Sequence, residues 1–135
     1  MRIIVLGGAG KMGCISVQTL AKDNRVNQVV IADINLEQAH QVADYLKSPK
    51  VEIQFVDIQN TDDFVQKLKG ADVCLNATVY YTNLIVMQAC LQAGVHYTDM
   101  GGLFHTTRKQ LELSPRFAEA GLSAVLGMGL SLIHI

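Results

Sequence analysis

Residues 2–13 of the chain, RIIVLGGAGKMG, join a short apolar run to a glycine-rich segment. The run from Arg2 to Leu6 is rich in β-branched residues and predicts a buried strand. Glycines at positions 8, 10 and 13 follow it at once, and residues 11–22 have the spacing of an amphipathic helix. The segment therefore predicts a strand, a tight glycine turn and a helix, in that order.

The rest of the chain repeats this alternation of apolar runs and helical segments. Parallel strands buried on both faces give such continuous apolar runs. The pattern predicts an α/β fold of the Rossmann-like, doubly wound class, with a mostly parallel six-stranded sheet and helices on both faces. The expected strands are 2–6, 26–32, 51–56, 73–75, 95–98 and 122–126, and the expected helices are 11–22, 35–46, 61–70, 84–91 and 114–121.

Helix starts and buried faces follow from the same pattern. Asn35 and Thr61 are expected to cap the second and third helices, because their side chains can accept from free N–H groups of the first turn. In the first helix the stripe Met12, Ile15, Leu20 and Ala21 is expected to face the sheet.

Composition limits the class of protein. The chain has 135 residues, of which 50% are hydrophobic and 17% charged, so it can bury one ordinary core. Its net charge of -1 gives no basic field for nucleic acid or for an anionic membrane, and no apolar run approaches the roughly 18 residues of a membrane span. Three widely spaced cysteines indicate buried thiols in a reducing cytoplasm. We expect a cytoplasmic protein with a small-molecule partner, no nucleic acid and no membrane.

The spacing Gly8-x-Gly10-x-x-Gly13 between a strand and a helix is typical of a dinucleotide-binding loop. Gly8 is expected to make the tight turn, Gly10 to let the backbone approach a diphosphate, and Gly13 to let the helix pack closely. The helix N-terminus would face the phosphates with free N–H groups. The expected binding segment also includes Ala9, Lys11 and Met12.

Asp33 lies at the end of the second predicted strand, twenty residues after Gly13. A carboxylate there can accept from both hydroxyls of the adenine ribose, which favours NAD as the cofactor. A 2′-phosphate at about 4 Å would be repelled by roughly 4 kcal/mol per charge pair at an effective dielectric of about 20. Residues 34–36 contain no Arg or Lys to offset this, so NADP is the less favoured cofactor.

Polar residues also end the third and fourth predicted strands. Asn76, Ala77 and Thr78 are expected at the ligand edge of the sheet, where Asn76 and Thr78 could contact the nicotinamide ribose. For Asn76 alone, a cap or turn role is about equally favoured. Asp57 could lie near the adenine, although its position alone favours a solvated turn carboxylate.

These features resemble the saccharopine dehydrogenase family. The resemblance rests on the glycine loop, Asp33, Asp57, Asn76-Ala77 and residues 93–99, AGVHYTD, and extends through residue 129. Within the family the chain is similar to lysine 6-dehydrogenase and to amino-acid and polyamine reductases. The resemblance implies NAD(P)-dependent hydride transfer at a carbon–nitrogen bond of an amino-acid or amine substrate.

The expected organisation is a cofactor domain over residues 1–129 whose substrate domain, with the catalytic residues, is missing. The last residues, 130–135 (LSLIHI), resemble the translation of a sequencing adapter and are expected to be a non-native tail. No metal site is expected, and Tyr97 and Asp99 receive no catalytic role. The oligomeric state stays open, with a homodimer as one option.

The alternative is a non-catalytic dinucleotide sensor related to short-chain dehydrogenases. Gly7, Gly10 and Gly13 also fit the loop spacing of that class. No tyrosine of the chain has a lysine four residues on, however, so the catalytic short-chain version is disfavoured.

Overall fold

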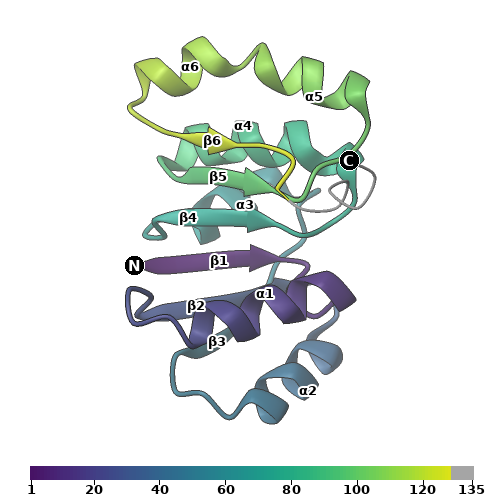
Figure 1. The fold of residues 1–135 in the computed structure, drawn as a ribbon, viewed down its shortest axis with the longest axis vertical. Helices are drawn as coiled ribbons and strands as arrows, with labels where there is room; N and C mark the ends of the chain where they lie inside the picture. Colours follow the sequence, from purple (N-terminus) through teal and green to yellow (C-terminus); the bar gives the residue numbers. More distant parts are fainter. Residues whose placement is uncertain (129–135) are drawn as a thin grey trace.

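The chain folds around one six-stranded sheet in which every strand pair is parallel (Figure 1). The structure is a computed structural model and describes residues 1–128. The strand order is β3-β2-β1-β4-β5-β6. The predicted α/β class and the six-stranded sheet are confirmed. The strands are β1 (Arg2–Leu6), β2 (Gln28–Asp33), β3 (Val51–Phe55), β4 (Val73–Asn76), β5 (His96–Asp99) and β6 (Ala124–Val125).

Helices cover the two faces of the sheet, as expected for a doubly wound fold. Figure 1 shows α1 and α2 in front of the sheet, and α3 and α4 behind it. The helices are α1 (Lys11–Ala21), α2 (Leu36–Leu46), α3 (Thr61–Leu68), α4 (Asn83–Ala93), α5 (Phe104–Leu111) and α6 (Ser114–Glu119), with a 3-10 turn η1 (Tyr80–Thr82) before α4.

The central strand β1 supplies side chains to two separate cores. Ile3 and Val5 pack with α1 and α2, whereas Ile4 and Leu6 pack with α3, α4 and α6. Successive side chains of a strand point to opposite faces, and here both faces are covered. This is why the run from Arg2 to Leu6 shows no alternation of polar and apolar residues.

The strand order reverses between β1 and β4, and the register fixes what meets there. Leu6 is paired with Ala32 of β2 and with Asn76 of β4. The residues that follow them, Gly7, Asp33 and Ala77, therefore lie together at the carboxyl edge of the sheet. In open α/β sheets ligands bind outside the carboxyl ends of the strands at such a reversal.

The buried face of α1 differs from the predicted one. Met12 and Ile15 are 45% and 56% exposed, and the buried residues are Gly13 and Val17. Gly13 packs directly against the preceding loop, which turns the helix about its axis relative to the face chosen by hydrophobicity.

Three further features of the secondary structure differ from the sequence prediction: a helix cap, a helix and the length of a strand. Helix α3 begins at Thr61 with Asn60 as its N-cap, and neither supplies a side-chain cap. Helix α5 falls in a segment where no helix was predicted, because six of its eight residues are polar or charged and leave no continuous apolar stripe. Strand β6 has two residues instead of five.

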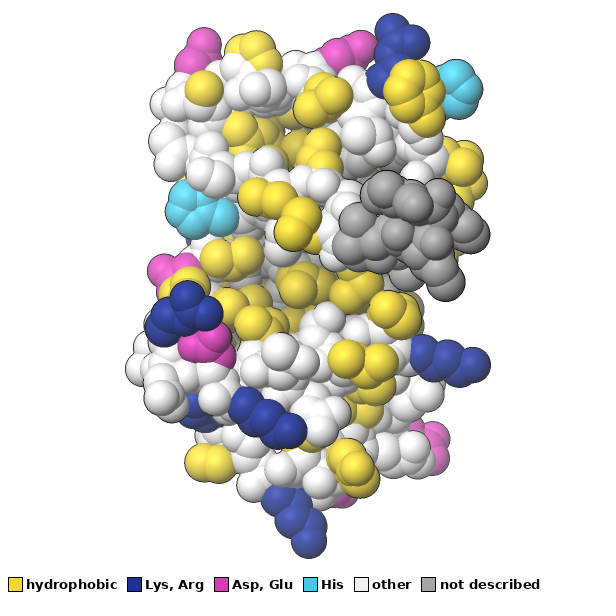
Figure 2. Space-filling model, in the orientation of Figure 1, with side chains coloured by type: hydrophobic (Ala, Val, Ile, Leu, Met, Phe, Trp, Pro, Cys, Tyr) yellow, Lys and Arg dark blue, Asp and Glu magenta, His cyan; other side chains and the backbone are white. Residues whose placement is uncertain are grey.

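Part of the sheet has no helix over it within residues 1–128. Val125 of β6 is 49% exposed, and Figure 2 shows hydrophobic side chains across the middle of the face that carries α1. No helix in this described part is long and apolar enough to cross a membrane. The predicted boundary at residue 129 and the predicted tail 130–135 lie outside the described residues.

Candidate functional site

The loop between β1 and α1 turns at Gly7. Gly7 has a φ of 71°, in the left-handed region that glycine adopts without strain. Its N–H donates to the Ala32 carbonyl of the neighbouring strand (2.9 Å), and its own carbonyl accepts from the Gly10 N–H (2.9 Å). The tight turn expected at Gly8 is therefore made by Gly7, since Gly8 does not have a positive φ.

Gly13 gives α1 its close approach to this loop. A Cβ atom at position 13 would lie 2.0 Å from the Gly7 carbonyl oxygen and 2.8 Å from the Gly8 Cα. Both atoms belong to the backbone, so a side chain there could be accommodated only by moving the loop. The expected packing role of Gly13 is confirmed.

The first turn of α1 forms an uncapped helix N-terminus beside the loop. Its N-cap residue is Gly10, no side chain caps it, and its first turn contains no acidic residue. Lys11 and Met12 are exposed there, next to buried Ala9. Such an end offers N–H groups and a partial positive charge to an anion, so these residues fit the diphosphate of a dinucleotide.

Asp33 ties the second strand to the glycine loop. One oxygen of its carboxylate accepts from the Ala9 N–H (3.1 Å), and the other accepts from the Asn35 N–H (3.0 Å). A carboxylate has about four acceptor positions, so two stay available for ribose hydroxyls. Asp33 is half-buried and lies at the wall of a hollow.

This hollow has a volume of about 270 Å³ and opens at the reversal of the strand order. It brings together Gly7, Asp33, Asp57 and Thr78, from the loops after four different segments of the sheet. Asp57 also accepts from the Gln59 N–H (3.0 Å), which is the turn role that its position favoured. The hollow thus combines three oxygen acceptors with the glycine loop.

Asn76 has the turn role, which was one of the two roles expected for it, and not the ribose contact. It is 1% exposed, and its amide binds protein groups: it accepts from the Thr78 N–H (3.1 Å) and donates to Asn83 (2.9 Å) and Thr82 (3.2 Å). Asn76 is therefore not placed to contact a ribose directly. Ala77, half-buried, donates its N–H to the Leu6 carbonyl (2.9 Å) and extends the strand pairing.

Asp99 at the end of β5 is the centre of a buried cluster that the sequence analysis did not find. It is 2% exposed, and four donors reach its carboxylate: the Tyr97 hydroxyl (2.8 Å), the Gln110 amide (2.8 Å), and the backbone N–H groups of Gly101 (2.9 Å) and Gly127 (2.8 Å). Charge-assisted hydrogen bonds of this kind offset the cost of burying a carboxylate.

Tyr97 lies between Asp99 and Asn76 in this cluster. Burial, with the Asp99 carboxylate as a smaller cause, raises the pKa of its phenol far above the ordinary range. Tyr97 therefore stays protonated and donates a hydrogen bond to Asp99. The sequence carried one weak signal for the cluster, because Asn76 and Asp99 each directly follow a predicted strand.

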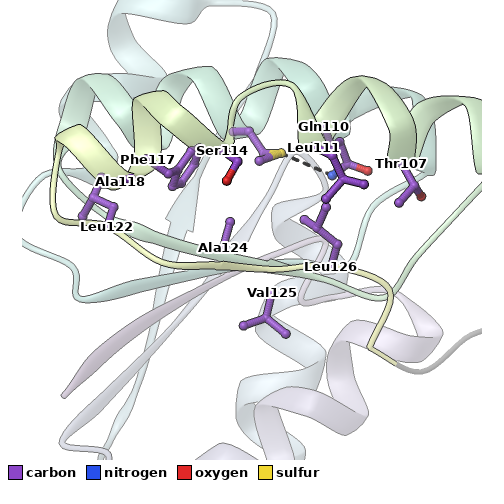
Figure 3. A pocket seen from close by; sticks show the side chains of 11 residues that line it. Thr107, Gln110, Leu111, Ser114, Phe117, Ala118, Leu122, Ala124, Val125 and Leu126 are labelled. Atoms are coloured by element: carbon purple, nitrogen blue, oxygen red, sulfur yellow. Dashed lines mark hydrogen bonds between the residues drawn. The ribbon is translucent and has the colours of Figure 1, made fainter.

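A larger hollow of about 540 Å³ lies elsewhere, between α5, α6 and β6 (Figure 3). Leu111, Phe117 and Leu126 give it an apolar lining, and Gln110 beside it donates to the Met87 sulfur (3.3 Å). None of the residues expected to bind a cofactor lines it. We therefore place the candidate site at the smaller hollow, where the glycine loop and the acceptors converge.

The described part of the chain does not form a metal site. Within residues 1–128 no group of three or more His, Cys, Asp or Glu side chains is arranged to hold a metal ion. The three cysteines, Cys14, Cys74 and Cys90, are free thiols.

Comparison with known proteins identifies relatives of the whole described domain. Residues 3–125 match the family described as "Saccharopine dehydrogenase NADP binding domain". The chain is 31% identical over 137 residues to carboxyaminopropylagmatine dehydrogenase of Synechocystis, covering 96% of this chain and 34% of that protein. It is 24% identical to carboxynorspermidine synthase of Vibrio cholerae, covering 90% of this chain and 34% of that protein.

Solved structures share the fold. A saccharopine dehydrogenase (L-Glu forming) from Saccharomyces cerevisiae superposes with a TM-score of 0.81 at 20% identity, covering 96% of this chain and 27% of that one. A triphenylmethane reductase of Citrobacter, solved with NADP(H), gives a TM-score of 0.67 at 22% identity, covering 92% of this chain and 48% of that one.

The matched relatives are longer than this chain, and the family description names a cofactor. The chain spans about a third of the length of the curated relatives it matches. The family description names NADP, which favours NADP over the NAD expected from Asp33 and supports a nicotinamide dinucleotide in either case. The family match covers most of the chain, so the chain belongs to the saccharopine dehydrogenase NADP-binding domain family.

Proposed function

We propose that this domain binds a nicotinamide dinucleotide across the carboxyl ends of β1, β2 and β4. The observation that carries the proposal is the uncapped N-terminus of α1, held against the Gly7 turn by Gly13 and tied to Asp33 through the Ala9 N–H. The diphosphate would lie at the helix N-terminus, near Gly8, Gly10, Lys11 and Met12. The adenosine half would lie in the hollow with Asp33 and Asp57.

The choice of cofactor is where this chain's residues and the family description differ. The description favours NADP. Asp33 supports NAD instead, because a carboxylate at the end of β2 would repel a 2′-phosphate on a ribose bound beside it, and the next residues, Ile34, Asn35 and Leu36, carry no cation. Our proposal follows the residues of this chain: Asp33 controls the choice and favours NAD(H) over NADP(H).

For the whole protein we propose a dehydrogenase acting on a carbon–nitrogen bond of an amino-acid or polyamine-type substrate. The names of the Synechocystis and Vibrio relatives support this class of substrate. The bound nicotinamide would supply the hydride donor or acceptor. The residues described here would bind and orient the dinucleotide, and the substrate and the catalytic residues would belong to a second domain.

Other parts of the proposal concern the setting of the protein. Three free cysteines support a reducing, cytoplasmic location. A homodimer, the option that the sequence left open, stays a prediction that light scattering can test. The family match does not favour the non-catalytic sensor, because the family is named for a dehydrogenase.

Fluorescence titration of the chain with NADH and NADPH tests the binding proposal. We expect saturable binding of both, with the smaller dissociation constant for NADH. Asp33→Asn removes the charge and keeps one oxygen, which can accept from the Ala9 N–H or from the Asn35 N–H but not from both. It should weaken NADH binding and raise the affinity for NADPH relative to that for NADH. Asp44→Asn, an exposed carboxylate on α2, is the matched control and should change neither.

The outcomes separate the parts of the proposal. Tighter binding of NADPH by the wild-type chain would contradict the role given to Asp33 and favour the family description. Absence of binding to either nucleotide would contradict the site itself. The activity of the whole protein is tested by assaying a full-length gene product for NAD(P)-dependent oxidation of carboxyaminopropylagmatine.

A further inference from the structure

Thr78 is the first of three polar residues, with Tyr81 and Thr82, by which the segment after β4 lines the hollow. It is half-buried and lines the hollow together with Asp33 and Asp57. Its hydroxyl has one proton to donate and two lone pairs with which to accept. Which of these faces the hollow depends on where the proton is held.

The amide of Asn76 fixes that proton. The backbone N–H of Thr78 donates to Asn76 Oδ1 (3.1 Å), and because an N–H can only donate, the atom that it meets must be the amide oxygen. Thr78 Oγ1 lies 2.6 Å from the same oxygen. A carbonyl oxygen carries no proton, so the proton between these two atoms belongs to Thr78.

The hydroxyl of Thr82 is compatible with this position of the Thr78 proton. Its Oγ1 lies 2.8 Å from the Val79 carbonyl oxygen and 2.6 Å from Thr78 Oγ1, and either threonine could be the donor in the second contact. Because the proton of Thr78 is directed to Asn76 Oδ1, the donor between the two hydroxyls is Thr82. Thr78 then accepts one hydrogen bond from Thr82 and keeps one lone pair for the hollow.

A closed ring of buried side chains holds Asn76 in this orientation. Asn76 donates to Asn83 (2.9 Å) and to the Tyr97 hydroxyl (3.5 Å), and Asn83 donates to Gln110 (3.5 Å). Tyr97 and Gln110 both donate to Asp99 (2.8 Å each). The donors of the ring run from Asn76 to the Asp99 carboxylate. A reversed Asn76 amide would therefore set its oxygen against the oxygens of Asn83 and Tyr97, and its nitrogen against the Thr78 N–H.

We propose that Thr78 is a dedicated hydrogen-bond acceptor for the adenosine half of the dinucleotide, and that Asn76 is a positioning residue that makes it so. The adenosine half is chosen because Thr78 shares the hollow with Asp33 and Asp57, while ribose hydroxyls and the adenine amino group are donors that match these oxygens. The inference rests on the proposed function, since it takes the dinucleotide to occupy this hollow.

Isothermal titration of Thr78→Val with ADP and with NADH tests the acceptor. Valine keeps the shape and removes the oxygen, so both ligands should bind about three- to tenfold more weakly, and by the same factor. Thr78→Ser should restore the affinity, because it restores the hydroxyl. Thr19→Val, at an exposed site on α1, is the matched control and should leave both affinities unchanged.

Each result has a separate meaning. Unchanged ADP binding by Thr78→Val overturns the inference, as does a loss confined to NADH, which would place Thr78 at the nicotinamide half. Failure of the wild-type chain to bind ADP and NADH overturns the proposed function instead.

A double-mutant cycle tests the positioning role of Asn76. Asn76→Ala frees the proton of Thr78 and should weaken ADP binding, but it should have no further effect in a Thr78→Val background, because the group through which it acts is gone. An equal loss in both backgrounds overturns the role, since a general structural change would act in either. The titrations are made at a temperature at which circular dichroism shows each variant folded. If Asn76→Ala does not fold, the Thr78 variants alone decide the inference.

Discussion

The two halves of the carboxyl edge of the sheet treat their polar groups in opposite ways. In the half formed by β1 and β2, α1 starts without a side-chain cap, and Asp33 lies at the wall of a hollow. In the half formed by β4 and β5, Asn76 and Asp99 are 1% and 2% exposed and are bound by neighbouring protein groups. We call these the open half and the closed half.

The two halves differ in whether their polar groups are free to bind a ligand or are already hydrogen-bonded within the protein. Groups of the open half keep hydrogen-bonding capacity for a ligand, so changes there should alter binding through the loop. Groups of the closed half satisfy one another, so changes there should first cost stability. Thr78 lies where the two halves meet, because its hydroxyl lines the hollow and its proton is held by Asn76.

Gly13→Ala should have the largest effect, because it breaks the open half at its tightest contact. The new methyl group would lie 2.0 Å from the Gly7 carbonyl oxygen, and backbone atoms cannot move aside cheaply. We expect a loss of about 3 kcal/mol or more in the free energy of unfolding, measured by urea denaturation, together with loss of NADH binding. Thr19→Ala, exposed on the same helix, is the control. A stable variant that binds normally would refute the packing role of Gly13.

Asp99→Asn should break the closed half. The new amide nitrogen would face two donors in either orientation: the Tyr97 hydroxyl and the Gln110 amide, or the N–H groups of Gly101 and Gly127. We expect the free energy of unfolding to fall by about 2 kcal/mol, within the usual range for a buried donor that loses its acceptor. Asp44→Asn on the surface of α2 controls for loss of a carboxylate. Equal stability of the two variants would show that the four donors to Asp99 contribute nothing net.

The residues of the open half could be predicted from the sequence because they belong to a local motif with fixed spacing. Glycines at fixed spacing and an acid at the end of the next strand identified Gly10, Gly13 and Asp33 directly. The finer geometry could not be predicted: the turn falls at Gly7, and the packing of Gly13 rotates α1 so that Met12 is exposed.

The closed half could not be predicted because its members are far apart in the chain. Asp99 is bound by groups from residues 97 to 127, and Asn76 by groups from residues 78 to 97. Their meeting depends on the order of β4, β5 and β6 and on α5, a helix whose polar sequence carried little hydrophobic pattern. Asp99, a buried carboxylate without a motif, therefore received no catalytic role from the sequence.

Two neighbouring helix starts sharpen the comparison further. Helix α2 is capped by Asn35, whose side chain accepts from the Gln38 N–H (3.1 Å), whereas the Asn60 side chain at the start of α3 makes no such bond. Asn35→Ala should lower the free energy of unfolding by about 1 kcal/mol, and Asn60→Ala should cost less. Thermal and urea denaturation of the pair measures the difference. Equal losses would mean that the cap contact contributes nothing to stability.

The smallest expected effect is a dependence of stability on alkaline pH that originates in the closed half. Burial, and to a smaller extent Asp99, raise the pKa of Tyr97 in the folded chain, so above its ordinary pKa of about 10 the unfolded chain releases a proton that the folded chain keeps. Stability must then fall as pH rises, by at most about 1 kcal/mol at pH 10.5 for this group. Cys74, whose pKa is raised by its contact with Cys90 and by burial, adds to the fall in wild type and variant alike.

Tyr97→Phe should therefore show a shallower loss of stability between pH 8 and 10.5 in urea denaturation. Tyr45→Phe, at an 80% exposed side chain, is the control and should follow the wild type. Parallel curves for Tyr97→Phe and wild type would show that the phenol of Tyr97 ionises as readily in the folded chain as in the unfolded one, and that the closed half is open to water.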